Sequence, residues 1–102
     1  MPSKPPQTFP AEAQLLAGLG ERLRLARLRR GLTTSTVAAR CGISRPTLAK
    51  VERGDAAVTA GTYLRVMSVY GLADDVGAMA VDDVLGRRLQ DLALPVARKG
   101  RR

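Results

Sequence analysis

Two short helical patterns follow one another in residues 33–53 with almost nothing between them. Gly42 is suited to the left-handed conformation that ends a helix, and Ser44 is a residue type that caps the start of the next one. Only Gly42 and Ile43 therefore separate the first helix from the cap of the second. Two helices joined by so short a turn must cross at a steep angle, which limits the folds open to this chain.

Each pattern places apolar residues on one helical face, as expected for helices that pack against a shared core. Thr33 is suited to cap the first helix, and Gly54 follows the second. Pro46 stands in the first turn of the second helix, where a missing N–H costs nothing. The inward positions are Val37, Ala38, Cys41, Leu48 and Val51. The pattern predicts a helix-turn-helix.

The other periodic segments are also helical, and no segment has the alternation of a β-strand. We expect further helices near residues 19–30, 60–70, 74–79 and 82–92. Within the segment 60–70, Tyr63, Met67 and Tyr70 belong either to the core or to a dimer surface. The sequence thus predicts an all-α fold of five to six helices.

The chain is long enough for one domain, and it divides into three parts. Residues 1–14 contain four prolines among polar residues and are expected to form a disordered arm. Residues 15–80 are expected to form the helix-turn-helix domain. Residues 81–102 are expected to form a C-terminal helix and a basic tail.

The formal net charge is +8, from 17 Lys and Arg against nine Asp and Glu. Such a charge favours binding to polyanions, either nucleic acid or an anionic membrane surface. A membrane surface is disfavoured, because one Phe, two Tyr and no Trp offer few apolar anchors. Residues 20–54 hold nine basic side chains and two acidic ones, so one face of this segment is expected to be strongly positive.

The residues needed for most metal binding and acid–base catalysis are missing from the sequence. It has no His, and its one Cys, Cys41, cannot form an intramolecular disulfide. We therefore expect no metal site, no cofactor, no enzymatic activity, and a buried apolar role for Cys41. Prolines in residues 1–10 interrupt the apolar stretch that a signal peptide requires, so a cytoplasmic, nucleoid-associated location is expected.

Residues 32–54, LTTSTVAARCGISRPTLAKVERG, resemble the helix-turn-helix of the phage-repressor-like, or XRE, family of bacterial regulators. The residues that carry the resemblance are Ala38, Gly42, Ile43, Ser44, Leu48, Val51 and the closing Glu52 to Gly54. The similarity extends over residues 19–80. It implies a repressor-like DNA-binding domain that acts as a homodimer on a double-stranded DNA operator.

In a helix-turn-helix, the first residues of the second helix approach base edges in the major groove. Here these residues include Arg45 and Pro46, and Lys50 lies on the same exposed side one turn later. Arg45 and Lys50 are suited to guanine O6 and N7, whereas Pro46 offers only apolar contact to a thymine methyl. We therefore expect base contacts from Arg45, Pro46 and Lys50.

The resemblance assigns DNA phosphate contacts to Thr33, Thr34, Thr47 and Arg53. Backbone N–H groups at the start of the first helix of the motif would assist. Many family members have Gln where this chain has Thr34, and the shorter hydroxyl reaches less far toward phosphate or base. The resemblance also implies a partly buried structural ion pair between Arg27 and Glu52, which joins the helix before the motif to the end of the motif.

Residues 81–102, VDDVLGRRLQDLALPVARKGRR, resemble the C-terminal extension of HipB-like antitoxins. Those proteins repress their own operon and neutralise a HipA-type serine/threonine kinase toxin. The resemblance implies a type II toxin–antitoxin function, with a free-standing XRE regulator as the alternative. A protein-interaction adaptor that does not bind DNA is a rival from another class. RNA binding is a weaker rival, because stacking aromatic residues are nearly absent.

Overall fold

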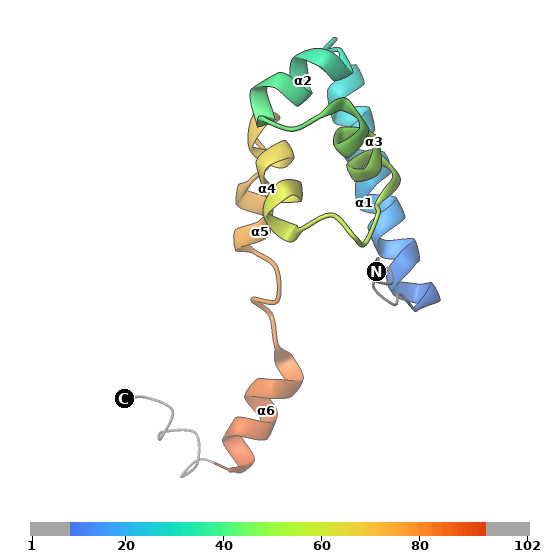
Figure 1. Cartoon of the computed structure of the whole chain (residues 1–102). Coiled ribbons are helices and arrows are strands. Elements are labelled where there is room, and N and C mark those ends of the chain that lie inside the picture. The colour runs from blue at the N-terminus through green and yellow to red at the C-terminus, as the bar shows by residue number, and fades with distance from the viewer. Residues whose placement is uncertain (1–8, 94–102) are drawn as a thin grey trace.

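The structure, a computed structural model, describes residues 9–93, and this part of the chain consists of helices joined by short connections (Figure 1). The helices are α1 (Pro10–Arg29), α2 (Thr34–Cys41), α3 (Arg45–Arg53), α4 (Ala60–Val69), α5 (Asp74–Gly77) and α6 (Val84–Leu92). The described residues contain no β-strand. The predicted all-α fold of five to six helices is therefore confirmed for residues 9–93, which form six.

The turn between α2 and α3 forms as the sequence predicts. Gly42 follows α2 in the left-handed conformation, with φ of 69°. Ser44 caps α3, because its Oγ accepts a hydrogen bond of 3.1 Å from the Thr47 N–H. Thr33 caps α2 in the same way through the Thr36 N–H, also at 3.1 Å. Each cap satisfies a backbone donor that the first helical turn leaves unpaired.

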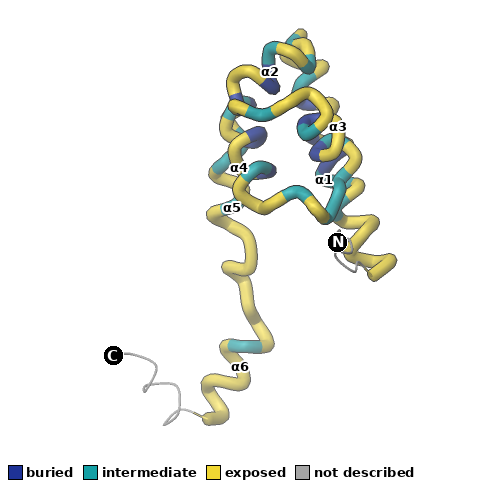
Figure 2. Tube along the Cα trace, viewed as in Figure 1, coloured by how far each residue is buried: buried dark blue, intermediate teal, exposed yellow. Residues whose placement is uncertain are grey.

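Helices α1 to α4 enclose one hydrophobic core (Figure 2). Helix α2 packs against α3 and α4, and α1 packs along α3. The buried core residues are Leu23, Ala26, Val37, Ala38, Cys41, Leu48, Val51, Tyr63, Val66, Met67 and Tyr70. Every residue predicted to face inward from α2 and α3 is among them. Because Ala38 is buried, a larger side chain at this position would force the neighbouring helices apart.

Helix α4 contributes its apolar face to this core. Tyr63, Met67 and Tyr70 are all buried, so of the two predicted alternatives the core is the one observed. The Tyr63 hydroxyl donates a hydrogen bond of 2.7 Å to the carbonyl of Asp55, in the loop before α4. Burial raises the pKa of Tyr70 to about 12, and the carboxylate of Glu52 acts in the same direction.

Helix α1 begins at Pro10, so the predicted start near residue 19 is wrong. Glycine lowers helix propensity, so Gly18 and Gly20 disfavour an earlier start on local grounds alone. Gly20 is buried in the middle of α1. Residues 10–14, expected to belong to the arm, are helical, whereas residues 1–8 of that arm lie outside the described residues.

The reason for a glycine inside α1 is a close approach between two backbones. A Cβ added to Gly20 would lie 2.5 Å from the N of Gly54 and 2.7 Å from the O of Val51, at the end of α3. A Cβ added to Gly54 would in turn overlap the backbone of Leu16. Helix α1 therefore crosses the end of α3 at a distance that only glycine allows on both sides.

Arg27 and Glu52 join α1 to α3 a little further along the same contact. Arg27 Nε donates to Glu52 Oε2 at 2.7 Å, and Nη2 donates to Oε1 at 3.1 Å. Arg27 Nη1 also donates to the carbonyl of Leu32 at 3.2 Å. The two paired side chains are 12% and 9% exposed, and the hydrogen bond to Glu52 raises the pKa of Arg27. This bidentate pair matches the one that the family resemblance implies.

The last two helices are shorter than predicted. Helix α5 ends at Gly77, two residues early, and α6 begins at Val84, two residues late. Asp83 caps α6, because its carboxylate accepts a hydrogen bond of 2.9 Å from the Gly86 N–H. Helix α6 lies apart from the body formed by α1 to α5, and it buries none of its residues (Figure 2). The predicted basic tail, residues 94–102, lies outside the described residues.

The variant Gly20→Ala should lower the free energy of unfolding by about 2 kcal/mol, because a Cβ has no room between α1 and α3. Gly18→Ala is the matched control in the same helix. A Cβ on Gly18 would meet only the end of the flexible Arg22 side chain, at 3.1 Å. Its gain in helix propensity should therefore raise stability by about 0.5–1 kcal/mol. Urea denaturation measures both changes, and equal stabilities would argue against the close approach.

The variant Arg27→Ala should lower the free energy of unfolding by about 3 kcal/mol or more, because it leaves the Glu52 carboxylate buried without its partner. The double variant Arg27→Met/Glu52→Leu should recover much of this loss, since it removes both charges and refills the space. Arg24→Ala breaks the exposed pair with Glu21 and should cost less than about 1 kcal/mol. Chemical denaturation measures the free energy of unfolding of all three variants. If Arg27→Ala and Arg24→Ala lower it by the same amount, the prediction is wrong.

Candidate nucleic-acid interface

Helix α3 has one face in the core and the opposite face in solvent. Leu48 and Val51 are completely buried. Arg45, Pro46 and Lys50 are exposed on the other side. Packing of the inner face sets the rotation of the helix, so the three predicted base-contact residues lie together on the surface, on the side that a helix-turn-helix turns toward the major groove.

The side chain of Arg45 leans from the start of α3 toward the start of α2. Its Nη1 donates a hydrogen bond of 3.4 Å to the Oγ of Ser35. A guanidinium has five N–H donors, so this contact leaves most of them available to a base or a phosphate. Ser35 is not among the predicted site residues. Its place in the first turn of α2, directly after two threonines, is the sequence signal that could have indicated it.

The four predicted phosphate-contact residues lie at helix ends. Thr33 precedes α2 and Thr34 is its first residue, while Thr47 is in the first turn of α3. Arg53 is the last residue of α3, about 12 Å from Arg45 along the helix axis. Thr33 and Arg53 are exposed, whereas Thr34 and Thr47 are half-buried. The threonines therefore gather at the helix starts, and Arg53 stands separately.

Hydrogen bonds between hydroxyl groups decide which of these side chains has a hydrogen to donate. The Ser44 hydroxyl donates to Thr47 Oγ1 at 2.9 Å, so the hydrogen of the Thr47 hydroxyl stays free. The Thr33 hydroxyl donates to Thr36 Oγ1 at 3.0 Å, so at α2 the free hydrogen belongs to Thr36. Thr36 is not among the predicted site residues. The Ser/Thr-x-x-Thr spacing at the start of both helices is the signal for it.

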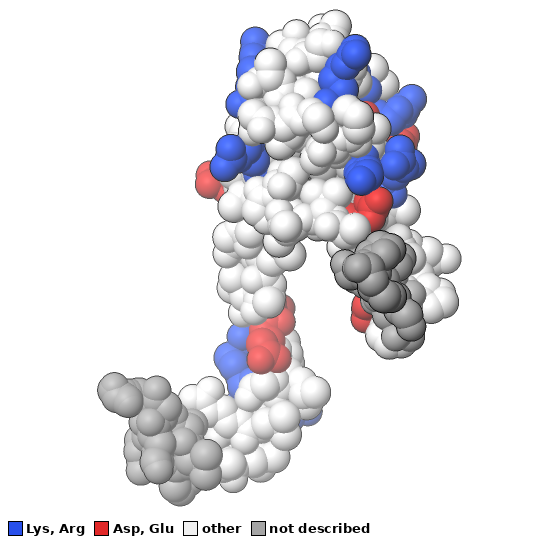
Figure 3. Space-filling model, in the orientation of Figure 1, with Lys and Arg blue, Asp and Glu red and all other residues white. Residues whose placement is uncertain are grey.

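The surface around α2 and α3 is positive because several of its basic side chains, among them Arg45, Lys50 and Arg53, form no ion pair within the described residues. Glu52 is bound to Arg27, and Glu21 is bound to Arg24 at 3.1 Å. Neither α2 nor α3 has an acidic residue in its first turn, where a carboxylate would offset the helix dipole. Figure 3 shows Lys and Arg side chains gathered over the half of the molecule that contains these helices. Such a surface suits an anionic backbone.

Other kinds of site find little support in residues 9–93. In that range, no group of His, Cys, Asp and Glu side chains could hold a metal ion. Cys41 is buried, and this burial raises the pKa of its thiol, so it is a small apolar core residue as predicted. None of the helices described is both long enough and apolar enough to cross a membrane.

Comparison with known proteins points to the same part of the chain. Residues 18–78 match the sequence model of a family described as a helix-turn-helix domain. The match contains α2 to α5, much of α1 and every predicted DNA-contact residue. A comparison with curated proteins found no match. The expected XRE-like domain is confirmed, and the chain belongs to the helix-turn-helix domain family, which indicates a DNA-binding regulator.

Proposed function

We propose that the chain is a sequence-specific transcriptional repressor that binds double-stranded DNA as a homodimer in the cytoplasm. The observation that carries this proposal is the outer edge of α3. Arg45 and Lys50 are exposed there, while Leu48 and Val51 hold the same helix in the core. A helix held in this way can enter the major groove without first becoming ordered.

The predicted contacts divide between reading bases and holding the backbone. Arg45 and Lys50 donate to guanine O6 and N7, and Pro46 packs against a thymine methyl group. The residues that hold phosphates are Thr33, Thr34, Thr47 and Arg53; Thr33 does so through its backbone N–H, because its hydroxyl already donates to Thr36. In a dimer, the two copies of α3 enter successive major grooves about 34 Å apart, so the operator is pseudo-palindromic.

Selection of binding sites from random DNA duplexes by the purified protein tests this function. Sequencing of the bound DNA should give a short motif repeated in inverted orientation, with centres about 10 base pairs apart. Binding should weaken steeply with salt, because each phosphate contact releases counterions. If the protein retains no duplex at physiological salt, the repressor proposal is wrong and the adaptor is favoured.

The variant Arg45→Ala should relax the preference at one base pair per half-site and leave the others intact. Loss of one bidentate contact removes about 1–3 kcal/mol of discrimination between bases. Because Arg45 is exposed, the fold should not change. Repeating the site selection with the variant measures the preference at each position. An unchanged motif would remove Arg45 from the set of base-reading residues.

Arg53→Ala is the matched variant, since it removes the same exposed side chain and the same charge from the other end of α3. It should weaken binding to all sequences about equally and reduce the salt dependence by about one counterion per half-site. The selected motif should stay the same. A changed motif with Arg53→Ala would move this residue from the phosphate to the base-reading class.

At a finer level, we propose that the chain is the HipB-like antitoxin of a type II toxin–antitoxin pair. The feature that supports this role is the sequence of residues 81–102, which resembles the C-terminal extension of HipB-like antitoxins. The chain would then neutralise a HipA-type serine/threonine kinase and repress its own operon. A free-standing XRE regulator without a toxin is the alternative.

Co-purification separates these two alternatives. The tagged full chain, expressed from its own operon, should bring down a kinase encoded by an adjacent gene. Expression of that kinase alone should arrest growth, and co-expression of the chain should restore it, because the complex holds the kinase inactive. With no adjacent kinase gene and no co-purifying kinase, the chain is a free-standing regulator, and the DNA-binding proposal is unaffected.

A further inference from the structure

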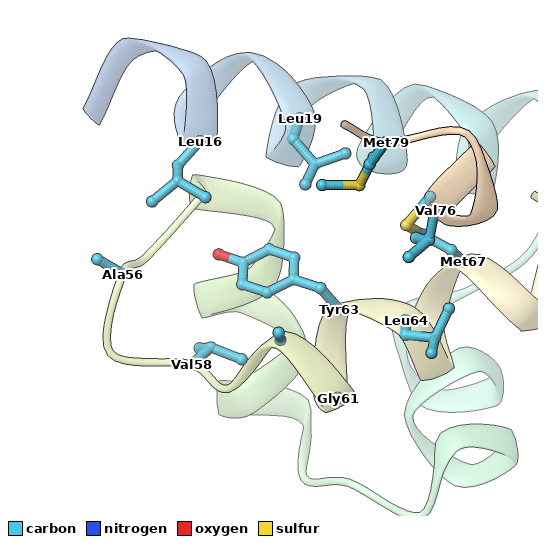
Figure 4. A pocket seen from close by; sticks show the side chains of 11 residues that line it. Leu16, Leu19, Ala56, Val58, Gly61, Tyr63, Leu64, Met67, Val76 and Met79 are labelled. Atoms are coloured by element: carbon cyan, nitrogen blue, oxygen red, sulfur yellow. The ribbon is translucent and has the colours of Figure 1, made fainter. Parts of the chain in front are cut away.

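An apolar groove lies between α1 and α4 on the body of the molecule (Figure 4). Its volume is about 400 Å³. Figure 4 shows Leu16 and Leu19 of α1 on the side opposite the Tyr63 ring of α4. The one polar side-chain group in its lining, the Tyr63 hydroxyl, already donates to the Asp55 carbonyl. The groove therefore lacks the free polar groups that orient a small polar ligand, and it suits an apolar side-chain cluster.

Helix α6 carries an apolar stripe that nothing in the described chain covers. Leu85, Leu89 and Leu92 are spaced by four and three residues, which places them on one face. Their exposed fractions are 67%, 56% and 81%. A helix of nine residues is marginal in water by itself, so α6 needs a surface on which to pack. Within residues 9–93, the chain thus has an apolar groove without an occupant and an apolar helix face without a partner.

Two acidic residues flank the groove lining, whereas the sequence after α6 is basic. Glu12 lies four residues before Leu16, on the same face of α1, and Asp55 directly precedes Ala56 in the groove lining. Within the α6 segment itself, Arg87 and Arg88 are offset by Asp82, Asp83 and Asp91. The sequence after α6 adds four basic residues and no acidic one. These charges favour the α6 segment over an acidic partner helix.

The path of the chain favours the groove of a second copy over the groove of the same copy. Met79 lines the groove, and the residues after it lead α6 away from the body (Figure 1). The connecting residues 80–83 are exposed, and Ala80 has a positive φ of 60°. To fill its own groove, the chain would have to reverse direction within these four residues. If two copies exchange their α6 helices, the chain does not have to reverse its direction. The two-fold axis of such a dimer repeats the contact, which doubles the buried area.

We propose that α6 of one protomer docks its leucine stripe into the groove between α1 and α4 of the partner, which returns the same contact. The stripe consists of Leu85, Leu89 and Leu92. The inference rests on the homodimer of the proposed function, and it supplies the interface of that dimer. The recognition helices stay free, because neither α2 nor α3 contributes a side chain to the groove.

The first test compares two variants of the full chain. Leu89→Asp places a carboxylate in the apolar contact and should raise the Kd of the dimer roughly 30-fold or more. Gln90→Asp introduces the same side chain on the far side of α6 and should leave the Kd unchanged. Sedimentation equilibrium measures both. If Leu89→Asp dimerises as tightly as the unmodified chain, the inference is wrong.

The second test locates the contact without disturbing the leucines. A spin label is attached through Gln90→Cys in an unlabelled chain with Cys41→Ser, and this chain is mixed with an isotope-labelled unmodified chain. Resonances of groove residues such as Leu16 and Leu64 in the labelled chain should broaden. Broadening confined to α6 would mean that the two copies of α6 pair with each other, and unbroadened groove resonances in the isotope-labelled chain would mean that α6 does not reach the groove of its partner. Either outcome overturns the inference.

Failure of this inference is distinguishable from failure of the repressor proposal. The site selection reads the half-site preference of α3, which does not depend on where α6 docks. A Leu89→Asp protein that is monomeric and still prefers the same half-site supports both proposals. A protein that dimerises through another surface but selects an inverted repeat overturns only the docking of α6.

Discussion

The contact between α1 and the end of α3 determines how the rest of the structure is arranged. Gly20 and Gly54 let the two backbones approach at a distance that a Cβ would prevent on either side. The ion pair between Arg27 and Glu52 closes the same contact with two hydrogen bonds, and Arg27 also holds the carbonyl of Leu32 before α2. One arginine thus links α1, the connection to α2 and α3. The tilt of α3, and with it the direction of its exposed side, follows from this arrangement.

The helix-turn-helix itself could be predicted from local signals. Gly42 and Ser44 each have one local role, a left-handed helix end and a side-chain cap, and the structure contains both. The inward positions followed from helical spacing, since Leu48 and Val51 recur on one face. These signals need no knowledge of the partner helix, because each depends on backbone atoms within a few residues.

The errors and omissions arose where residue type and local spacing do not decide the contact. By propensity alone, Gly20 argues against a helix at this position. Its role is to allow close contact with the backbone of Gly54, which the sequence does not reveal. The roles of Ser35 and Thr36 depend on the direction of a side chain and on which hydroxyl donates, and neither is set by residue type. The base and phosphate contacts stay predictions, since they depend on the position of a duplex.

The separation between the two faces of α3 has a consequence for how such a protein changes in evolution. Arg45, Pro46, Ala49 and Lys50 are exposed, and the residues that hold the helix are on its other side. Exchange of an outer residue therefore has little cost in stability. The outer surface of α3 can therefore change by single substitutions, without compensating changes in the interior.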